Sequence, residues 1–548
     1  MNIKLISILA LVTIIATISP HQVNAQNDRY FEISKNLQIF AEVYKELNAN
    51  YVDELDPNEL MRIGIDAMVN SLDPYTTYIS EAQIASYRLN DQETYKGIGA
   101  RMEVIDDYVT VVEPYDGGPA LEAGLKAGDQ IRNVGRYATK GRSLEEVSAI
   151  VKGAPGTEAQ LQIYRPSSGE TLAITLIRGS VERQNVPHYD MVSPEVAYVS
   201  LTTFTQAAGS NIAKGLKELQ KDNPNMKGVI LDLRHNGGGL LAEALHVTNI
   251  FVPKGLDLVT TKGKVKDRDR AFKTRNVPVD VEIPLVVLID NKSASASEIV
   301  SGSIQDLDRG VIMGQRSYGK GLVQNTKDLN YNSRVKLTTS KYYILSRRCI
   351  QSVAYENGEP KDIPDEQRSV FKTKNGRKVL DGGGITPDIK LEPKKVSPLL
   401  KALNKEYIIF KYANDYFEKQ SAIKDPVAFK FSDYAGFIAF AENLGFKYKT
   451  GSNTVLTTLE EKLIEDDIDE ELKSSIDKLK VAINTAKADD FEQYKDEIIF
   501  EVEQELVSRY FNQKGRIQKQ LQNDSEVSAA IELLNDRTRY DDILKSPM

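Results

Sequence analysis

The sequence predicts a multidomain α+β protein built around a central α/β core. Three observations support this class. Apolar residues recur at helical spacing near both ends of the chain, short strand-like runs with glycine turns follow the first helical segment, and strands then alternate with helices. Such alternation is typical of a parallel sheet covered by helices. The expected segments are residues 1–25, 26–90, 91–180, 181–395 and 396–548.

Residues 1–25 have the pattern of an export signal that is removed from the mature protein. Lys4 supplies a positive charge, an apolar run extends from Leu5 to Ile18, and small residues end at Ala25. An apolar run of 14 residues is shorter than the stretch of about 20 that spans a bilayer. We therefore expect an exported protein with no stable membrane span after cleavage.

The two helical segments differ in charge. Apolar residues such as Ile39, Val43 and Leu47 recur along residues 26–90, and a turn at Asp73-Pro74 closes that segment. Residues 396–548 are more charged and the pattern predicts a packed helical domain without its own activity. A dimer arm, a docking surface for an adaptor and a cap on an active site remain alternatives for this domain.

Composition excludes several classes of function. The formal net charge of −8 and the absence of a basic run argue against a nucleic-acid partner. Cys349 is the only cysteine, so no disulfide can form within the chain. No cysteine or histidine cluster has metal-ligand spacing, and no glycine loop is convincing for phosphate. We expect neither a metal nor a cofactor.

A turn in the α/β core carries the strongest chemical signal. The apolar run Pro284–Ile289 predicts a buried strand, and the sequence Ser-Ala-Ser-Ala-Ser-Glu then leads into a helix from Glu298 to Asp306. A serine there would lie near free backbone N–H groups and the positive end of a helix dipole, which suits a nucleophile with an oxyanion hole. The structural alternative is a capping box formed by Ser295 and Glu298.

A lysine follows in a setting that favours burial. Lys320 lies between two glycines, directly before the strand-like run Leu322–Asn325. A lysine can act as a general base only if burial lowers its pKa from about 10.4 toward 7–8. Gln324 is four residues further on, so its side chain shares a face with Lys320 if the segment is extended, and it would help to hold that side chain.

These motifs resemble those of the C-terminal processing peptidases, the tail-specific serine peptidases of family S41. That family has a serine in a Ser-Ala-Ser-Ala-Ser-Glu turn, a lysine 25 residues later and a glutamine four residues after the lysine, which selects Ser295 over Ser293 and Ser297. The resemblance implies a serine endopeptidase with a crotonase/ClpP-like parallel sheet. In it Ser295 would be the nucleophile, Lys320 the general base and then acid, and Gln324 the residue that orients Lys320.

The resemblance extends to an oxyanion loop. Residues 232–239 read Asp-Leu-Arg-His-Asn-Gly-Gly-Gly and are similar to the family's Asp-Leu-Arg-x-Asn-x-Gly-Gly loop. It implies that the backbone N–H groups of Gly238 and Ala296 hold the oxyanion. Gly237 stands where proline is common in the family. His235 in this loop is the candidate base of a rival mechanism, a Ser/His hydrolase that acts on small esters.

Residues 95–179 resemble a PDZ domain, with Gly97-Ile98-Gly99 as the carboxylate-binding loop and Ala123–Ile131 as a further signature. Glycines let successive N–H groups converge on a peptide's C-terminal carboxylate while the peptide adds a strand to the sheet edge. The resemblance implies that this domain binds C-terminal tails of protein substrates and can gate the catalytic site.

The function expected from these features is cleavage of exported proteins near their C-termini, in the periplasm by analogy with the family. Secretion and peripheral membrane association are the alternatives for the location. In relatives the N-terminal helices contribute to dimerisation, so the resemblance implies a homodimer. A packing role without a partner is equally open for those helices. Besides the Ser/His hydrolase, a PDZ scaffold with an inactive peptidase-like domain remains an alternative.

Overall fold

The computed structural model describes residues 21–545 except 82, 85–94, 182–183, 352–353, 357–358, 362, 421, 449–450, 467–469 and 488. Most of the expected export signal, residues 1–20, lies outside the described residues, and residues 21–25 begin the first described helix. The chain forms two compact units, residues 1–78 with 357–359 and the remainder. In the described part of the chain no helix is long and apolar enough to cross a membrane.

The first unit is helical, as the sequence predicts. Helix α2 spans His21–Asn50 and α3 spans Pro57–Asn70. Helix α3 begins where the Asp56 carboxylate accepts hydrogen bonds from the N–H groups of Asn58 and Glu59, with a proline at the first helical position. After α3 the carboxylate of Asp73 accepts bonds from the N–H groups of Tyr75 and Thr76, which closes the helical segment in a tight turn before β1 (Thr77–Ile79).

The predicted β-rich domain is an antiparallel sheet with the strand order β3-β4-β5-β7-β8. Its core comprises apolar residues of the sheet and of helix α6, such as Val109, Ile131 and Val147. Helix α6 begins at a capping box between Ser143 and Glu146. The elements are β2 (Tyr95–Gly97), β3 (Ala100–Ile105), β4 (Tyr108–Pro114), α5 (Pro119–Glu122), β5 (Gln130–Val134), β6 (Tyr137–Ala138), α6 (Leu144–Val151), β7 (Glu158–Arg165), β8 (Glu170–Ile177) and β9 (Gly179–Val181).

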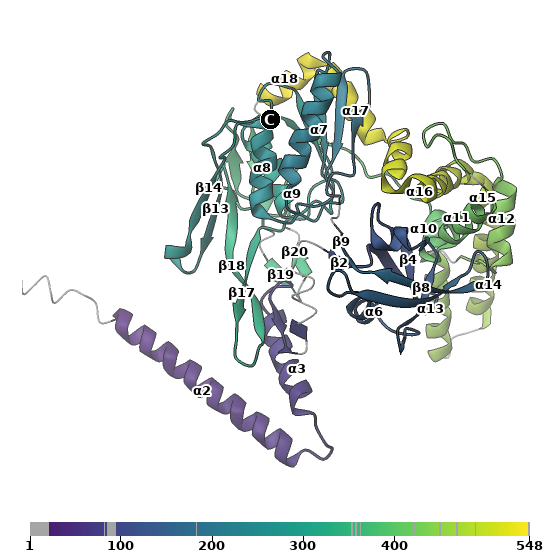
Figure 1. Ribbon diagram of the computed structural model, residues 1–548. Helices are drawn as coiled ribbons and strands as arrows, with labels where there is room; N and C mark the ends of the chain where they lie inside the picture. The colour runs from purple at the N-terminus through teal and green to yellow at the C-terminus, as the bar shows by residue number, and fades with distance from the viewer. Residues whose placement is uncertain are drawn as a thin grey trace, which may run out of the picture. The chain divides into compact units, whose positions relative to one another are not determined.

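The predicted parallel sheet forms the centre of the α/β core (Figure 1). Its order is β10-β11-β12-β15-β16-β23, and all neighbours pair in parallel except the edge pair β10 and β11, which the sequence did not indicate. The central strands β12 and β15 are buried on both faces, which explains their continuous apolar runs. They are β10 (His188–Met191), β11 (Val196–Ser200), β12 (Gly228–Asp232), β15 (Leu285–Ile289), β16 (Val311–Gly314) and β23 (Ile389–Lys390).

Helices from two distant parts of the chain cover this sheet. Helices α7 (Ala208–Asp222), α8 (Leu241–Phe251) and α9 (Ala296–Asp306) pack on one face, together with the inward residues of the strands. The other face packs against α17 (Ser525–Asn535) and α18 (Arg537–Lys545), the last helices of the chain. The C-terminal helices therefore share a hydrophobic core with the α/β sheet.

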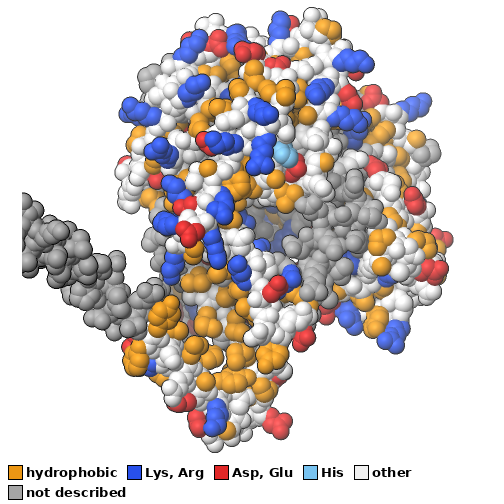
Figure 2. All heavy atoms as spheres, turned by 60° about the vertical axis from the view of Figure 1, so that its left-hand side comes forward, with side chains coloured by type: hydrophobic (Ala, Val, Ile, Leu, Met, Phe, Trp, Pro, Cys, Tyr) orange, Lys and Arg blue, Asp and Glu red, His pale blue; other side chains and the backbone are white. Residues whose placement is uncertain are grey.

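A second sheet extends from the core and contains the long β17–β18 hairpin. Strand β18 pairs with β17 and with β13, and β13 pairs with β14. Lys and Arg side chains gather on this side of the molecule (Figure 2). The exposed basic residues here include Lys262, Lys264, Lys266, Arg268, Arg270, Lys273 and Lys341. The strands are β13 (Asp257–Gly263), β14 (Arg270–Lys273), β17 (Leu322–Asp328) and β18 (Arg334–Ile344), with short β19 (Ala354–Glu356), β20 (Glu359–Lys361), β21 (Val370–Lys372) and β22 (Lys378–Leu380) after them.

The C-terminal segment is helical, as predicted, and its first part has a separate hydrophobic core. Helix α16 is broken at Asn512, where φ is 51° and ψ is −151°. Residues after the break, Ile517 and Leu521, contact the cluster beneath the parallel sheet. Besides α17 and α18 the helices are α10 (Pro398–Lys405), α11 (Ile408–Lys419), α12 (Tyr434–Asn443), α13 (Gly451–Glu465), α14 (Glu470–Ala486), α15 (Asp490–Gln493) and α16 (Lys495–Leu521).

Candidate active site

Ser295 lies on a strained turn between β15 and α9. Its φ of 55° and ψ of −110° are unusual for a residue with a side chain, and its exposed fraction is 8%. The carboxylate of Asp290 supports the turn by accepting hydrogen bonds from the N–H groups of Lys292 and Ser293 at 3.0 and 2.9 Å. This geometry presents Ser295 at the amino end of α9, where the helix dipole is positive.

Glu298 connects the serine turn, residues 291–297, to the lysine loop, residues 315–320. Its carboxylate is fully buried and accepts hydrogen bonds from the N–H groups of Ser295, Gly319 and Lys320 at 2.7–2.8 Å and from the hydroxyl of Ser317 at 2.6 Å. Burial raises the pKa of the Glu298 carboxyl, and the four hydrogen bonds oppose that shift. The carboxylate half of the expected capping box is thus present, and it also orders the loop that carries Lys320.

Lys320 is half-buried beside the serine turn. Burial lowers the pKa of its ammonium group, the positive charge of Lys336 lowers it further, and Glu298 opposes both effects. The direction of this shift is the one that a lysine general base requires, because only the neutral amine can accept a proton.

Gln324 lies on β17, where its side-chain amide donates to the Thr338 hydroxyl across the hairpin at 3.2 Å. The register of the two strands shifts between Val323 and Gln324. A register shift changes which side chains share a face, so the simple four-residue spacing does not settle the direction of Gln324 relative to Lys320. Its role in orienting the lysine stays a prediction.

Gly238 packs directly against the nucleophile turn. It has a φ of 98°, and a Cβ atom at this position would lie 2.9 Å from both the Ala296 nitrogen and the Ser295 Cβ. Only glycine fits this approach. The N–H of Gly238 donates to the Asn236 side chain at 2.9 Å, so this conformation uses the expected oxyanion donor within its own loop. Ala296 is the first residue of α9, a position whose N–H has no partner within the helix.

Asn236 is a structural part of the site that the sequence analysis did not single out. It is fully buried, and its side chain donates to the Leu201 carbonyl at 2.7 Å. Its own carbonyl accepts hydrogen bonds from the Ala294 N–H at 3.0 Å and from the Ser297 hydroxyl at 2.8 Å. Asn236 therefore fixes the glycine loop against the serine turn. Its place in the Asp-Leu-Arg-x-Asn motif was the available signal.

His235 points to Asp290. Its Nδ1 lies 2.7 Å from Asp290 Oδ2, and 68% of its side chain is exposed. Burial opposes the charge of Asp290, but the hydrogen bonds from His235 outweigh burial and lower the pKa of that carboxyl. The pair resembles two members of a hydrolase triad, while the exposure of the imidazole is unfavourable for a base that must work in a dry site.

The expected peptide-binding loop occupies the start of an edge strand. Ile98 is fully buried, and Gly99 has a φ of 73°. The carbonyls of Ile98 and Gly99 accept hydrogen bonds from the N–H groups of Ala120 and Tyr115 at 2.6 and 2.9 Å. Strand β3 follows the loop and has β4 as its neighbour at one side of the sheet. Its other side is the edge to which a peptide strand can be added.

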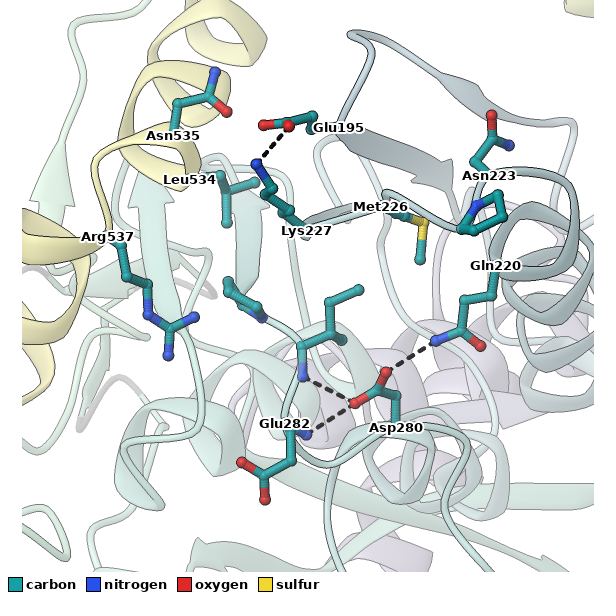
Figure 3. Close-up of a pocket in the computed structure, with 13 residues that line it drawn as sticks. Glu195, Gln220, Asn223, Met226, Lys227, Asp280, Glu282, Leu534, Asn535 and Arg537 are labelled. Carbon is teal, nitrogen blue, oxygen red and sulfur yellow. Dashed lines mark hydrogen bonds and ion pairs between the residues drawn. The ribbon is translucent and has the colours of Figure 1, made fainter.

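A cavity of about 790 Å³ lies at the amino end of the parallel strands, opposite to the end that carries Ser295 (Figure 3). Glu195, Lys227 and Pro284, which line it, precede β11, β12 and β15. Lys227 pairs with Glu195 at 2.5 Å at one side of the cavity. The Ser295 turn follows the carboxyl end of β15, so this cavity is separate from the predicted catalytic site.

Comparisons with protein families match three parts of the chain. Residues 195–359 match peptidase family S41, residues 97–176 match the PDZ domain, and residues 399–534 match a family described as the C-terminal helical domain of probable PDZ-proteases. The combination of an S41 core with a PDZ domain defines a class of serine peptidases.

Curated relatives give the same result. The chain is 33% identical over 335 residues to the carboxy-terminal-processing protease of Bartonella bacilliformis, covering 61% of this chain and 76% of that protein. It is 29% identical over 367 residues to the carboxy-terminal processing protease CtpA of Bacillus subtilis, covering 66% and 75%. The structure of a photosystem II D1 C-terminal processing protease is 26% identical, with a TM-score of 0.37 and coverage of 65% and 93%. The chain belongs to the carboxy-terminal processing proteases of family S41, which are serine peptidases.

Proposed function

We propose that this protein is an exported endopeptidase that cleaves protein substrates near their C-termini with a Ser295/Lys320 dyad. The observation that carries the proposal is the convergence of the two residues on Glu298, whose Oε2 accepts the backbone N–H of each at 2.8 Å. The names of the relatives supply carboxy-terminal processing as the reaction. The pattern of residues 1–25 supports export, with the periplasm as the expected location.

The proposed mechanism gives each of these groups one role. Neutral Lys320 takes the proton from the Ser295 hydroxyl as its oxygen attacks the scissile carbonyl. The N–H groups of Ala296 and Gly238 hold the resulting oxyanion, for which Gly238 must exchange its bond to Asn236. Protonated Lys320 then gives its proton to the leaving amine. Lys320 next removes a proton from the water that attacks the acyl-enzyme and gives it to the departing Ser295 oxygen, which restores the free serine. Gln324 keeps the Lys320 side chain directed at Ser295.

The PDZ domain would select substrates by their C-terminal tails. A tail carboxylate would bind at Gly97, Ile98 and Gly99, and the residues before it would pair with the edge of β3. The φ of 73° at Gly99 and the position of β3 at an edge of the sheet, among the described residues, support this proposal.

Contacts between the PDZ domain and the C-terminal helices support gating. Ile105 and Val112 of the PDZ sheet pack against Phe410 of α11. The Tyr115 N–H donates to the Gly99 carbonyl. The next residue, Asp116, accepts a hydrogen bond from the side chain of Asn512 at the break of α16. A chain of contacts therefore runs from the peptide loop to the helices that cover the catalytic sheet.

The first experiment compares residues 26–548 with the Ser295→Ala, Lys320→Ala and His235→Ala variants on unfolded casein, with cut sites mapped by mass spectrometry. Lys341→Ala is the matched control because Lys341 is an exposed lysine on β18. We expect cutting by the parent, the control and His235→Ala, and none by folded Ser295→Ala or Lys320→Ala. Cutting by Lys320→Ala at the parent rate contradicts the dyad, and loss of activity only in Ser295→Ala and His235→Ala favours the Ser/His hydrolase.

Gating is tested by Asp116→Ala, with exposed Glu122→Ala as the control in the same domain. A tail peptide that binds the PDZ domain should stimulate cleavage of a second substrate by the parent and by the control. Stimulation should be weaker in Asp116→Ala. Equal stimulation in all three proteins, or unchanged cleavage after deletion of residues 95–179, would reject gating.

A further inference from the structure

The first turn of α17 contacts both loops of the predicted catalytic site. Glu526 Oε2 accepts a hydrogen bond from Arg234 Nη1 at 2.6 Å, and Glu526 Oε1 accepts one from the Gln315 side chain at 2.5 Å. Arg234 belongs to the glycine loop, residues 232–239, which carries Gly238. Gln315 begins the lysine loop, residues 315–320, which carries Lys320. One carboxylate from the end of the chain thus bridges two segments that are distant from it in sequence.

Arg234 is held by acidic side chains on several sides. Its guanidinium lies 2.6 Å from Asp232, 2.7 Å from Asp524 and 2.6 Å from Glu526, and only 13% of its side chain is exposed. Burial disfavours the charge of Arg234, but Asp232 and Asp524 outweigh burial and raise the pKa of the guanidinium. Charge-assisted bonds of this geometry hold a planar guanidinium in one orientation. The loop that carries Arg234 is therefore fixed relative to α17.

Helix α17 has a cap and an apolar docking face that do not involve the carboxylate of Glu526. Asp524 already caps the helix by accepting the N–H groups of Glu526 and Val527. Docking onto the sheet uses the apolar face of the helix, with Val527, Ala530 and Leu533 buried there. Each oxygen of the Glu526 carboxylate instead accepts a hydrogen bond from one of the two loops.

We propose that Glu526 is a positioning residue that sets the spacing between the glycine loop and the lysine loop. This inference rests on the proposed function, because those loops carry Gly238 and Lys320. Glu298 joins the lysine loop to the serine turn inside the core, and Glu526 joins the lysine loop to the glycine loop from the C-terminal helices. The C-terminal segment thereby completes the catalytic site without contributing a reacting group.

The test compares Glu526→Gln with Glu532→Gln, which makes the same change at an exposed position of the same helix. Arg234 and Gln315 donate to different oxygens of Glu526, and a glutamine replaces one of these oxygens by an NH2 group that turns its own hydrogens toward a donor, so one of the two bonds is lost in this geometry. We expect kcat of Glu526→Gln to fall by about tenfold to 100-fold, as misplaced catalytic groups do, with KM for a tail-bearing substrate within about twofold. Glu532→Gln should match the parent. Equal kcat in both variants would overturn the proposal.

Two further measurements separate positioning from loss of folding and from failure of the proposed function. Thermal unfolding measures the stability of each variant, and titration of reactive serines counts the active sites. If the loss of kcat is explained by fewer folded active sites, the proposal is overturned. Hydrogen exchange of backbone amides needs no activity. Residues 232–240 and 314–321 should exchange faster in Glu526→Gln than in Glu532→Gln, and equal exchange contradicts the inference. Activity of Ser295→Ala in the same assay would instead reject the dyad.

Discussion

The backbone N–H groups of Ser295 and Lys320 donate to the same oxygen of Glu298, each at 2.8 Å. Two residues that are 25 positions apart are thus held around one buried atom. The Ser317 hydroxyl and the Gly319 N–H occupy the other oxygen, so the carboxylate is surrounded by donors. A dyad needs a fixed distance between nucleophile and base, and this arrangement fixes the backbone of both.

Replacement of Glu298 by glutamine should damage both stability and activity. The Ser317 hydroxyl accepts a hydrogen bond from the Ile385 N–H and donates one to Glu298. The four groups that contact the carboxylate are therefore all hydrogen-bond donors. A glutamine would turn its own N–H groups toward two of these donors. We expect a loss of about 3 kcal/mol in the free energy of unfolding, measured by urea denaturation, together with a large loss of kcat.

Glu146→Gln is the matched control for that change, because Glu146 occupies the third position of an exposed capping box on α6. It should cost less than about 1 kcal/mol. A Glu298→Gln protein as stable and as active as the control would show that the buried carboxylate does not organise the site.

The pH dependence of cleavage should report the environment of Lys320. The proposed base is active when neutral, so kcat/KM rises with pH through the Lys320 pKa, which burial and Lys336 lower. Lys336→Ala removes a like charge, which raises that pKa and moves the rising limb to higher pH. Lys341→Ala on the same strand should leave the limb in place. A limb that stays fixed or moves to lower pH in Lys336→Ala would contradict Lys320 as the base.

The fold was predictable where the periodicity of the sequence was strong. Runs such as Leu285–Ile289 are apolar because both faces of the strand are buried, and this run predicted a buried strand. The alternation of such strands with helices predicted the parallel sheet. The position of α17 was not predictable, because its apolar face has the same period whether it packs on other helices or on a sheet. Motif spacing selected Ser295 and Lys320. Nothing in a single sequence links Glu526 to Arg234, since that contact depends on how a distant helix docks.

A buried ion pair at the second half of α16 gives a stability prediction. Lys519 is fully buried, lies 2.9 Å from Glu503 and donates to the Phe429 carbonyl at 2.6 Å. Lys519→Met leaves the buried Glu503 charge with only the exposed Lys430 at 4.0 Å and the Phe431 N–H at 2.8 Å, at an expected cost of about 3 kcal/mol in the free energy of unfolding. The double variant Lys519→Met/Glu503→Gln should recover part of that loss in denaturant titration. No recovery would indicate that the lysine acts through packing alone.

Gly99→Ala should separate recognition of substrate tails from catalysis. The φ of 73° at Gly99 is strained for any residue with a Cβ atom, and its carbonyl bonds to the Tyr115 N–H, so the loop must shift. A shifted loop can no longer converge its N–H groups on a carboxylate. We expect weaker binding of a tail peptide by calorimetry and a higher KM for a tail-bearing substrate, with kcat/KM unchanged for the same peptide amidated at its C-terminus. Gly135→Ala, which places a Cβ at a φ of 55° in open space elsewhere in the domain, controls for the strain itself. If both variants bind the tail peptide as the parent does, the loop at Gly97–Gly99 is not the carboxylate site.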